Sequence, residues 1–376
     1  MNLAFLRPLY DEAGDVVSVY LDTDRAHENA DEAIGLRWRA ASERLAKCGA
    51  DPDTLAAVQE VVGDPDEAAR GRAVFARHGA VAFTGALDAP PRREIARLAP
   101  LPHLMPLLAQ HRPPIPHVRV SATRAGGEIV AVGATGAEWR DWVEGRQWPV
   151  HKTSVGGWSQ PRHQRSTEET WQENAKALAA EVDTVAHRIR ASHAVVAGDV
   201  RERSLLLDHL PAQLRQNAAV LEEEVTADSP AMAAAADRAL GEWAARRCRE
   251  RFDDWRAKLA HGLAVQGLAE SLAAFRDGQV ADLFLADDPT STASAWIGPE
   301  PADVAAAQQE LADLGVRHPA GDRADAAIVR AVTGTDAELH FLTGDLVETG
   351  DPAALGGITS PRDGVCATLR FSIGSR

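Results

Sequence analysis

In the first hundred residues, segments whose hydrophobic pattern is typical of a β-strand alternate with segments whose pattern is typical of an α-helix. Residues 16–21 form a run rich in β-branched and aromatic side chains, which predicts a strand. From residue 31 to residue 47 the apolar positions recur at near-helical spacing, so we expect a helix there. Further elements expected in this stretch are a helix that is capped by Asp53 and ends at Val62, and a strand at residues 80–83.

A proline-rich segment at residues 88–116 ends this stretch, and we place the first domain boundary near its end. Strand patterns resume at residues 117–122 and 128–132, and the Gly126–Gly127 pair between them is typical of a hairpin turn. A loop rich in Gly, Arg and Trp is expected from Gly133 to Gln164. The elements expected after it are a helix from a cap at Ser166 or Thr167 to Ser192, a strand at 194–198, a short helix at 204–209 and a strand at 220–226.

A long helical pattern starts at Ser229–Pro230, extends to His261 and is interrupted by Gly262, which is typical of a connector between domains. The remaining chain alternates again between strand and helix patterns, as in an α/β/α sandwich. The elements expected there are helices at 263–275, 302–314 and 326–332 and strands at 280–286, 294–297, 338–342 and 365–371. We therefore expect an α/β protein with three domains, at residues 1–115, 116–262 and 263–376, of which the first and second are also α/β.

Composition narrows the class of protein. Hydrophobic residues make up 45% and charged residues 25% of the 376 residues, as in folded soluble proteins. No window is apolar enough to cross a membrane, and the first residues lack the pattern of a signal peptide. The three cysteines lie far apart and show neither a zinc-binding nor a disulfide pattern. We therefore expect a cytoplasmic protein with no membrane partner, no metal site and no cofactor.

Charge is distributed unevenly along the chain. The formal net charge of −15 argues against a general nucleic-acid binder. Between Ile95 and Arg165, however, nine Lys or Arg stand against four Asp or Glu, a local net charge of +5. We expect this cationic segment to contact RNA phosphate while the rest of the chain repels random RNA, although chance segregation of charge stays open. The histidines expected to add RNA contacts there are His103, His111, His117, His151 and His163.

Residues 152–165 combine the residue types of a protruding RNA contact. Two adjacent glycines allow a tight turn or a close approach between backbones, and residues 145–165 contain no acid. Lys and Arg attract phosphate, whereas Trp, Arg and His can stack on bases. An ordinary flexible loop would have a similar composition. The residues that we expect to contact RNA are Lys152, Gly156, Gly157, Trp158, Ser159, Arg162, His163 and Arg165.

The same residues resemble a known loop. Residues 156–159 read Gly-Gly-Trp-Ser and are followed by Arg162, Arg165 and a long helix. This pattern resembles the Gly-Gly-Gln-Ser-x-x-Arg-x-x-Arg loop of the archaeo-eukaryotic release factor and Pelota superfamily, and only Trp158 departs from it. The resemblance extends to four further segments, at residues 118–133, 194–199, 272–288 and 364–371. Residues 1–115 resemble the bacterial branch of the superfamily, which includes Balon-like ribosome-hibernation factors and their mycobacterial relatives.

The resemblance implies a fold and a place of action. The central domain would be RNase H-like and carry the loop, and the third domain would bind a translational GTPase, with EF-Tu as the bacterial candidate. The chain would be a monomeric, non-enzymatic factor in the A site of the bacterial ribosome. Residues 152–165 would face large-subunit rRNA near the peptidyl-transferase centre, and the N-terminal domain would face the decoding region. The implied role is ribosome hibernation or stress protection.

Trp158 stands where the family has a glutamine that helps water attack the peptidyl-tRNA ester. The backbone N–H of Trp158 could still donate to an oxyanion. The indole is much larger than the amide, however, and it offers a donor but no acceptor. We therefore expect no peptide release.

Two other functions fit parts of the sequence. A rescue factor or nuclease that hydrolyses peptidyl-tRNA or tRNA could use the Trp158 loop, or use Asp22 and Asp24 as a carboxylate pair for magnesium. The Asp22-Thr23-Asp24 sequence is also typical of a turn at a strand end. The second alternative is an RNA-binding adaptor that acts away from the ribosome.

Overall fold

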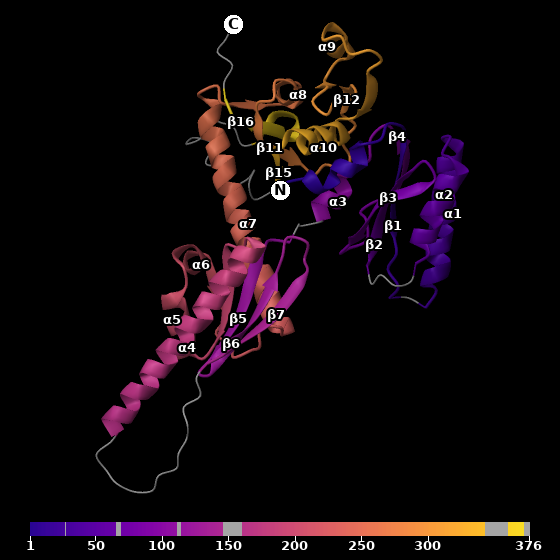
Figure 1. The fold of residues 1–376 in the computed structure, drawn as a ribbon. Coiled ribbons are helices and arrows are strands. Elements are labelled where there is room, and N and C mark those ends of the chain that lie inside the picture. Colours follow the sequence, from indigo (N-terminus) through magenta and orange to yellow (C-terminus); the bar gives the residue numbers. More distant parts are fainter. Residues whose placement is uncertain (27, 65–68, 111–113, 146–159, 343–359, 372–376) are drawn as a thin grey trace. The chain divides into compact units, whose positions relative to one another are not determined.

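The computed structural model describes residues 1–26, 28–64, 69–110, 114–145, 160–342 and 360–371, and of residues 160–167 it describes the backbone alone. The chain is a mixed α/β protein that divides into two compact units (Figure 1). The larger unit joins residues 1–112 with residues 248–376, and the smaller unit comprises residues 113–247. Helix α7 (Pro230–Leu259), predicted at 230–261, contributes residues to both units. The division into three domains stays a prediction.

An antiparallel sheet of order β3-β2-β1-β4 forms the first part of the larger unit. Its strands are β1 (Val16–Asp22), β2 (Gly71–Arg77), β3 (Ala80–Leu87) and β4 (Ile95–Ala99). Helices α1 (Ala30–Lys47) and α2 (Pro52–Val62) cover one face, where Val19 lies in the same core as Trp38 and Val58. The other face carries Tyr20 and Phe75 and packs with the short helices η1 (Ala4–Tyr10) and α3 (Met105–Gln110).

The predictions for this part are confirmed in outline and corrected in detail. The strand at 16–21 and the helix at 31–47 are present with nearly the predicted bounds. The predicted cap at Asp53 is wrong, because Asp51 caps α2: its carboxylate accepts a hydrogen bond from the backbone N–H of Thr54 at 3.0 Å. Pro52 then occupies the first helical position, where its missing N–H costs nothing.

The last part of the larger unit is a sheet with helices on both faces, which confirms the predicted α/β/α arrangement. The strand order is β10 (Ala264–Gln266), β16 (Val365–Leu369), β11 (Val280–Ala286) and β15 (Glu338–Leu342). On one face Leu283 and Leu285 share a core with α8 (Leu268–Arg276) and α10 (Ala324–Thr335). On the other face Phe284 packs with Phe252 and Trp255 of α7. The remaining elements are a small sheet of β13 (Val304–Ala305), β12 (Ser294–Ile297) and β14 (Ala320–Arg323), helix α9 (Gln308–Asp313) and the short helix η2 (Arg362–Gly364).

Strands at 280–286, 294–297 and 338–342 have the predicted bounds. The predicted helices at 263–275 and 302–314 are wrong in their first halves, which form β10 and β13. Both segments carry apolar residues that suit either state, and pairing with a neighbouring strand decides between them.

The two ends of the chain share one hydrophobic core inside the larger unit. Leu6 of η1 lies in the same cluster as Ile328 of α10, and the N-terminal ammonium of Met1 donates to the Leu339 carbonyl at 2.9 Å. The buried carboxylate of Asp322 pairs with Arg97 and accepts from the Leu101 backbone N–H at 2.9 Å. The first and last stretches of the sequence are therefore held together by buried polar bonds as well as by apolar contact.

The smaller unit is built on a mixed sheet of order β7-β6-β5-β8-β9, in which β5, β8 and β9 are parallel. The strands are β5 (His117–Thr123), β6 (Gly126–Val132), β7 (Glu138–Glu144), β8 (His193–Gly198) and β9 (Ala218–Val220). Helices α4 (Gln160–Ile189), α5 (Val200–His209) and α6 (Ala212–Gln216) bury one face around Val120 and Leu178. Met232 of α7 covers the other face beside Val195. No helix in the described parts of the chain is long and apolar enough to span a membrane.

Four predictions for the smaller unit are wrong, and one of them is the strand expected at 220–226, which lies instead at 218–220 as β9. Strand β7 lies inside the segment 133–164, which was expected to be a loop. The sequence did not indicate this strand, because its residues are exposed on both faces and show no alternation of apolar and polar positions. Helix α4 begins at Gln160 and not after Ser166 or Thr167, since Pro161 is compatible with a first helical turn. The hairpin turn consists of Arg124 and Ala125, and the Gly126–Gly127 pair begins β6.

Gly198 tests how closely β8 is held against β5. Its φ is +129°, and a Cβ there would lie 2.2 Å from the Ala122 carbonyl oxygen. We expect Gly198→Ala to lower the free energy of unfolding of the smaller unit by about 2 kcal/mol or more, because backbone strain and a steric clash add. Gly136→Ala is the control, since Gly136 has a positive φ but a Cβ there would meet Pro114 Cγ at an ordinary 3.4 Å. Urea unfolding measures both, and equal losses would show that the clash is absent.

Candidate nucleic-acid interface

Most of the residues predicted to contact RNA lie outside the described residues. Lys152, Gly156, Gly157, Trp158 and Ser159 belong to the segment 146–159, which joins β7 to α4. The backbone of Arg162, His163 and Arg165 lies in the first two turns of α4, and their side chains are outside the described part. Their contact with RNA therefore stays a prediction. The structure describes the elements on either side of the segment, which are strand β7 and helix α4, together with the β5–β6 hairpin on which they pack; we call these elements the frame.

The chain enters the segment at a hydrogen-bonded strand end. Glu144, the last residue of β7, is paired with Gly126 of β6. The next residue, Gly145, donates its backbone N–H to the Ala125 carbonyl at 2.6 Å. The entry to residues 146–159 is therefore tied to the β5–β6 turn.

The chain leaves the segment through helix α4, which is seated on the same corner of the sheet. Asn174 is buried, and its Nδ2 donates to the Arg124 carbonyl at 2.8 Å. One turn further on, Leu178 packs so closely on Gly127 that a Cβ on the glycine would lie 2.6 Å from Leu178 Cδ2. The entry to the segment 146–159 is thus tied to the β5–β6 hairpin, whereas its exit lies at Gln160, the first residue of a helix that is seated on the same hairpin only from Asn174 onward.

A tryptophan on α4 stacks with two arginines from other elements. The guanidinium carbons of Arg124 and Arg201 lie 5.2 Å and 4.7 Å from the ring centroid of Trp171. The side chains of both arginines are more than half exposed. Such a cation–aromatic cluster can hold arginines in a fixed orientation toward phosphate. The sequence reasoning missed it, because only the fold brings residues 124, 171 and 201 together.

Acidic side chains lie beside these arginines. Arg201 pairs with Glu168 at 2.7 Å, and Arg124 Nε lies 3.4 Å from the buried carboxylate of Glu202. Burial raises the pKa of Glu202, and the neighbouring Asp199 raises it further. Asp199 caps α5 by accepting from the Arg201 backbone N–H at 3.0 Å, and this bond lowers its own pKa. The arginine cluster is therefore partly neutralised and is no open basic patch.

The expected cationic face does not form from the described residues of 95–145. Arg97 pairs with Asp322, Arg119 is buried against Glu138, and Arg140 pairs with Asp228. The expectation that His103 and His117 contact RNA is wrong, because both are buried. His117 bonds to the Ile115 carbonyl at 2.8 Å, and His103 lies 3.5 Å from Asp325. His111 and His151 lie outside the described residues.

Asp22 and Asp24 form a turn at the end of β1. An Asp22 oxygen accepts from the Asp24 backbone N–H at 3.0 Å, and Asp24 accepts from Ala26 at 2.9 Å. Asp22 also pairs with Arg37 at 3.1 Å. These carboxylates accept hydrogen bonds from backbone N–H groups, and Asp22 also forms an ion pair. This arrangement is the turn at a strand end that the sequence also allowed. Among the described residues the group that could hold a metal lies elsewhere, at Asp282, Glu338 and His340.

A comparison with protein-family models matches residues 116–261 to the family described as "Bacterial archaeo-eukaryotic release factor family 2". The matched range begins at β5, ends after α7 and includes the segment 146–159. The elements described above and the segment 146–159 thus fall within the matched range.

Two proteins of Mycobacterium tuberculosis are similar to the chain over nearly its whole length. They are "Uncharacterized protein Rv2629" of strain ATCC 25618 / H37Rv and "Uncharacterized protein MT2704" of strain CDC 1551 / Oshkosh. Each is 29% identical over 391 residues, which cover 99% of this chain and 97% of the relative. Among solved structures, the crystal structure of Archaeoglobus fulgidus Pelota is 14% identical with a TM-score of 0.35 and covers 99% of this chain and 92% of that one. Similarity at that level adds no argument about function.

His193 generates a pH prediction for the smaller unit. It is buried, and its ring centroid lies 4.2 Å from that of Trp243. Burial, together with the charges of His117 and Arg247, lowers the pKa of His193 to about 4. A histidine in the unfolded chain has a pKa near 6.5. Between this pH and about pH 4 the unfolded chain therefore binds a proton at His193 that the folded chain does not bind. The contribution of neutral His193 to the free energy of unfolding is therefore present above about pH 6.5. The free energy of unfolding falls by about 2 kcal/mol between pH 6.5 and pH 4.5.

Urea unfolding across that pH range checks this prediction. His193→Gln should remove most of the loss, because glutamine does not titrate. His187→Gln, at an exposed position of α4, should retain it. A loss of equal size in the His193 variant and in the unaltered chain would assign the pH dependence to other groups.

Proposed function

We propose that the chain is a ribosome-associated translation factor that occupies the A site, and the match of residues 116–261 to the bacterial archaeo-eukaryotic release factor family supports this proposal. The observation that carries the proposal is the position of the segment 146–159 in the matched domain. It follows β7 and precedes α4, and the segment together with the first two turns of α4 contains the residues that match the family's loop. Those residues are Gly156, Gly157, Ser159, Arg162 and Arg165.

The frame supports a role for the segment as a probe of large-subunit rRNA near the peptidyl-transferase centre. Gly145 ties its entry to the β5–β6 hairpin, and Asn174 seats on the same hairpin the helix that follows the segment. The segment and the first turns of α4, at residues 146–165, contain only basic charge, with Arg146, Lys152, Arg162 and Arg165. Because the described arginines of residues 95–145 are paired, contact with RNA phosphate falls mainly to this segment.

Trp158 supports a factor that binds without releasing peptide. The indole N–H can donate a hydrogen bond, but the ring offers no carbonyl acceptor, so it cannot position water as a glutamine amide does. An aromatic side chain can instead stack on an unpaired base. The chain would keep the family's binding site and lack its hydrolytic group.

The remaining features of the proposal concern the role and the partners. A factor that fills the A site without reaction would block translation and protect idle ribosomes, which is the role of a hibernation or stress-protection factor in the cytoplasm. The last part of the chain, with its α/β/α sheet, would bind a translational GTPase such as EF-Tu, and the first part would face the decoding region. The chain would act as a monomer.

Sedimentation tests the ribosome contact. We expect the protein to travel with ribosomes when lysate of starved cells is separated on a sucrose gradient. Arg162→Glu/Arg165→Glu should lower the bound fraction about tenfold or more, because two phosphate contacts become repulsive. Lys176→Glu/Arg188→Glu is the matched control, since it makes the same charge change on exposed positions of the same helix. Co-migration that is unchanged in the Arg162/Arg165 variant would place binding elsewhere.

Peptide release tests the absence of hydrolysis. Purified protein added to stalled ribosomes that carry labelled peptidyl-tRNA should release no more peptide than buffer does. A bacterial release factor acting at a stop codon on the same ribosomes serves as the positive control. Efficient release by this protein would contradict the proposal and would assign hydrolysis to the Trp158 loop.

A further inference from the structure

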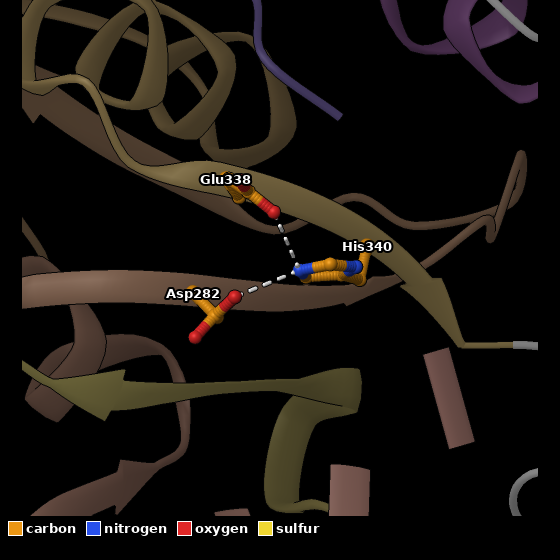
Figure 2. Close-up of side chains that lie close together, drawn as sticks. All are labelled: Asp282, Glu338 and His340. Carbon is orange, nitrogen blue, oxygen red and sulfur yellow. Dashed lines mark hydrogen bonds and ion pairs between the residues drawn. The ribbon is translucent and has the colours of Figure 1, made fainter. Parts of the chain in front are cut away.

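Three side chains with metal-binding atoms meet on one face of the last sheet of the larger unit. Strands β11 and β15 are parallel neighbours, and their register places Asp282 beside Glu338. Glu338 and His340 are two residues apart on β15 and therefore point to the same face as Asp282. Figure 2 shows the two carboxylates on either side of the His340 ring nitrogen.

The distances suit shared ligands of one ion. His340 Nε2 lies 3.0 Å from Asp282 Oδ1 and 3.7 Å from Glu338 Oε2, and the three ligand atoms all lie within 4.8 Å of one another. Donor atoms around a tetrahedral zinc ion, with bonds of about 2.1 Å, are separated by roughly 3.4 Å. Small adjustments of these side chains would place all three atoms on one ion.

Burial separates this group from ordinary surface acids. The side chains of Asp282 and His340 are 5% and 9% exposed, whereas that of Glu338 is 43% exposed. Two ligands are thus held by the core, and the third opens to solvent, where water could complete the coordination. The ring of His340 is further fixed by stacking on Phe284, with centroids 5.0 Å apart.

Asp282 uses its two oxygens for different partners. Oδ2 accepts from the Thr368 hydroxyl at 2.8 Å and faces Arg251 of α7 at 3.5 Å. Oδ1 faces His340 alone among the hydrogen bonds of the described residues. Metal-binding carboxylates are commonly oriented in this way by bonds to the oxygen that does not bind the metal.

We propose that Asp282, Glu338 and His340 form a binding site for a divalent transition-metal ion. One imidazole nitrogen and two carboxylate oxygens suit zinc or manganese, whereas magnesium favours sites made of oxygen alone. Thr368 and Arg251 position Asp282, and the ion links the edge strand β15 to β11. The alternative is a polar network without metal, in which His340 only donates to Asp282.

Titration of the full-length chain with zinc chloride, after removal of bound metal with a chelator, tests the site. Calorimetry should show one equivalent of zinc bound, and excess magnesium should not displace it. Glu338→Gln should weaken zinc binding at least tenfold without loss of the fold, because Glu338 lies at the exposed side. Glu270→Gln is the matched control: Glu270 is 46% exposed, forms an ion pair with Arg362, and its loss should leave zinc affinity unchanged.

A second variant, His340→Gln, removes the nitrogen ligand and should also weaken binding. If that variant fails to fold, Glu338→Gln alone decides the question. Absence of saturable zinc binding by the unaltered chain would overturn the proposal and leave the polar network. Zinc binding of unchanged affinity in the Glu338→Gln chain would also overturn it, because the ion would then lie elsewhere.

Discussion

The position of the candidate loop depends on one contact, the close packing of helix α4 on the β5–β6 hairpin. Leu178 rests on Gly127, where any side chain would prevent the approach, and Asn174 bonds to the Arg124 carbonyl. Strand β7 ends at the same corner, where Gly145 bonds to Ala125. The entry to the segment 146–159 is therefore fixed at this corner, and its exit is the first turn of a helix that is seated on the same corner from Asn174 onward.

The fold shows that several basic side chains of residues 95–145 form ion pairs and are not free to bind RNA. A net charge of +5 over residues 95–165 suggests a basic face, but the structure uses Arg97 and Arg119 inside the protein, in pairs with Asp322 and Glu138. Such pairs contribute to specific packing and leave little free charge on the surface. Residues 146–165 carry basic charge without any acid, whereas Arg124 and Arg201 beside Trp171 are partly neutralised by Glu202 and Glu168. An acidic chain with one short basic segment would bind RNA at that segment and repel RNA elsewhere.

Sequence patterns predict the regular elements of this fold well and its unusual ones poorly. Strands β8, β11 and β15 and helix α1 have clear periodicity and are found where expected. Strand β2 was not predicted, because it is buried on both faces yet contains Arg72 and Arg77, whose guanidinium groups bond to carbonyls of other segments. Strand β7 was missed for the opposite reason, since it is exposed on both faces.

The candidate sites divide in the same way. The glycine pair and the flanking arginines of residues 156–165 are neighbours in sequence, so a motif can be identified there before any fold is known. The Trp171 cluster and the group at Asp282 join residues that only the fold brings together; Asp282 and His340, for example, are 58 positions apart. Residue type alone does not predict whether a histidine is exposed: His103 and His117 were expected to contact RNA, but both are buried.

The most direct test of the account is a cryo-electron microscopy map of the purified protein bound to bacterial ribosomes. The account predicts density for the smaller unit in the A site, with Gly156, Gly157 and Trp158 at the peptidyl-transferase centre and Arg162 and Arg165 against rRNA phosphate. Density for the protein at another ribosomal surface, or an A site that stays empty at saturating protein, would contradict it.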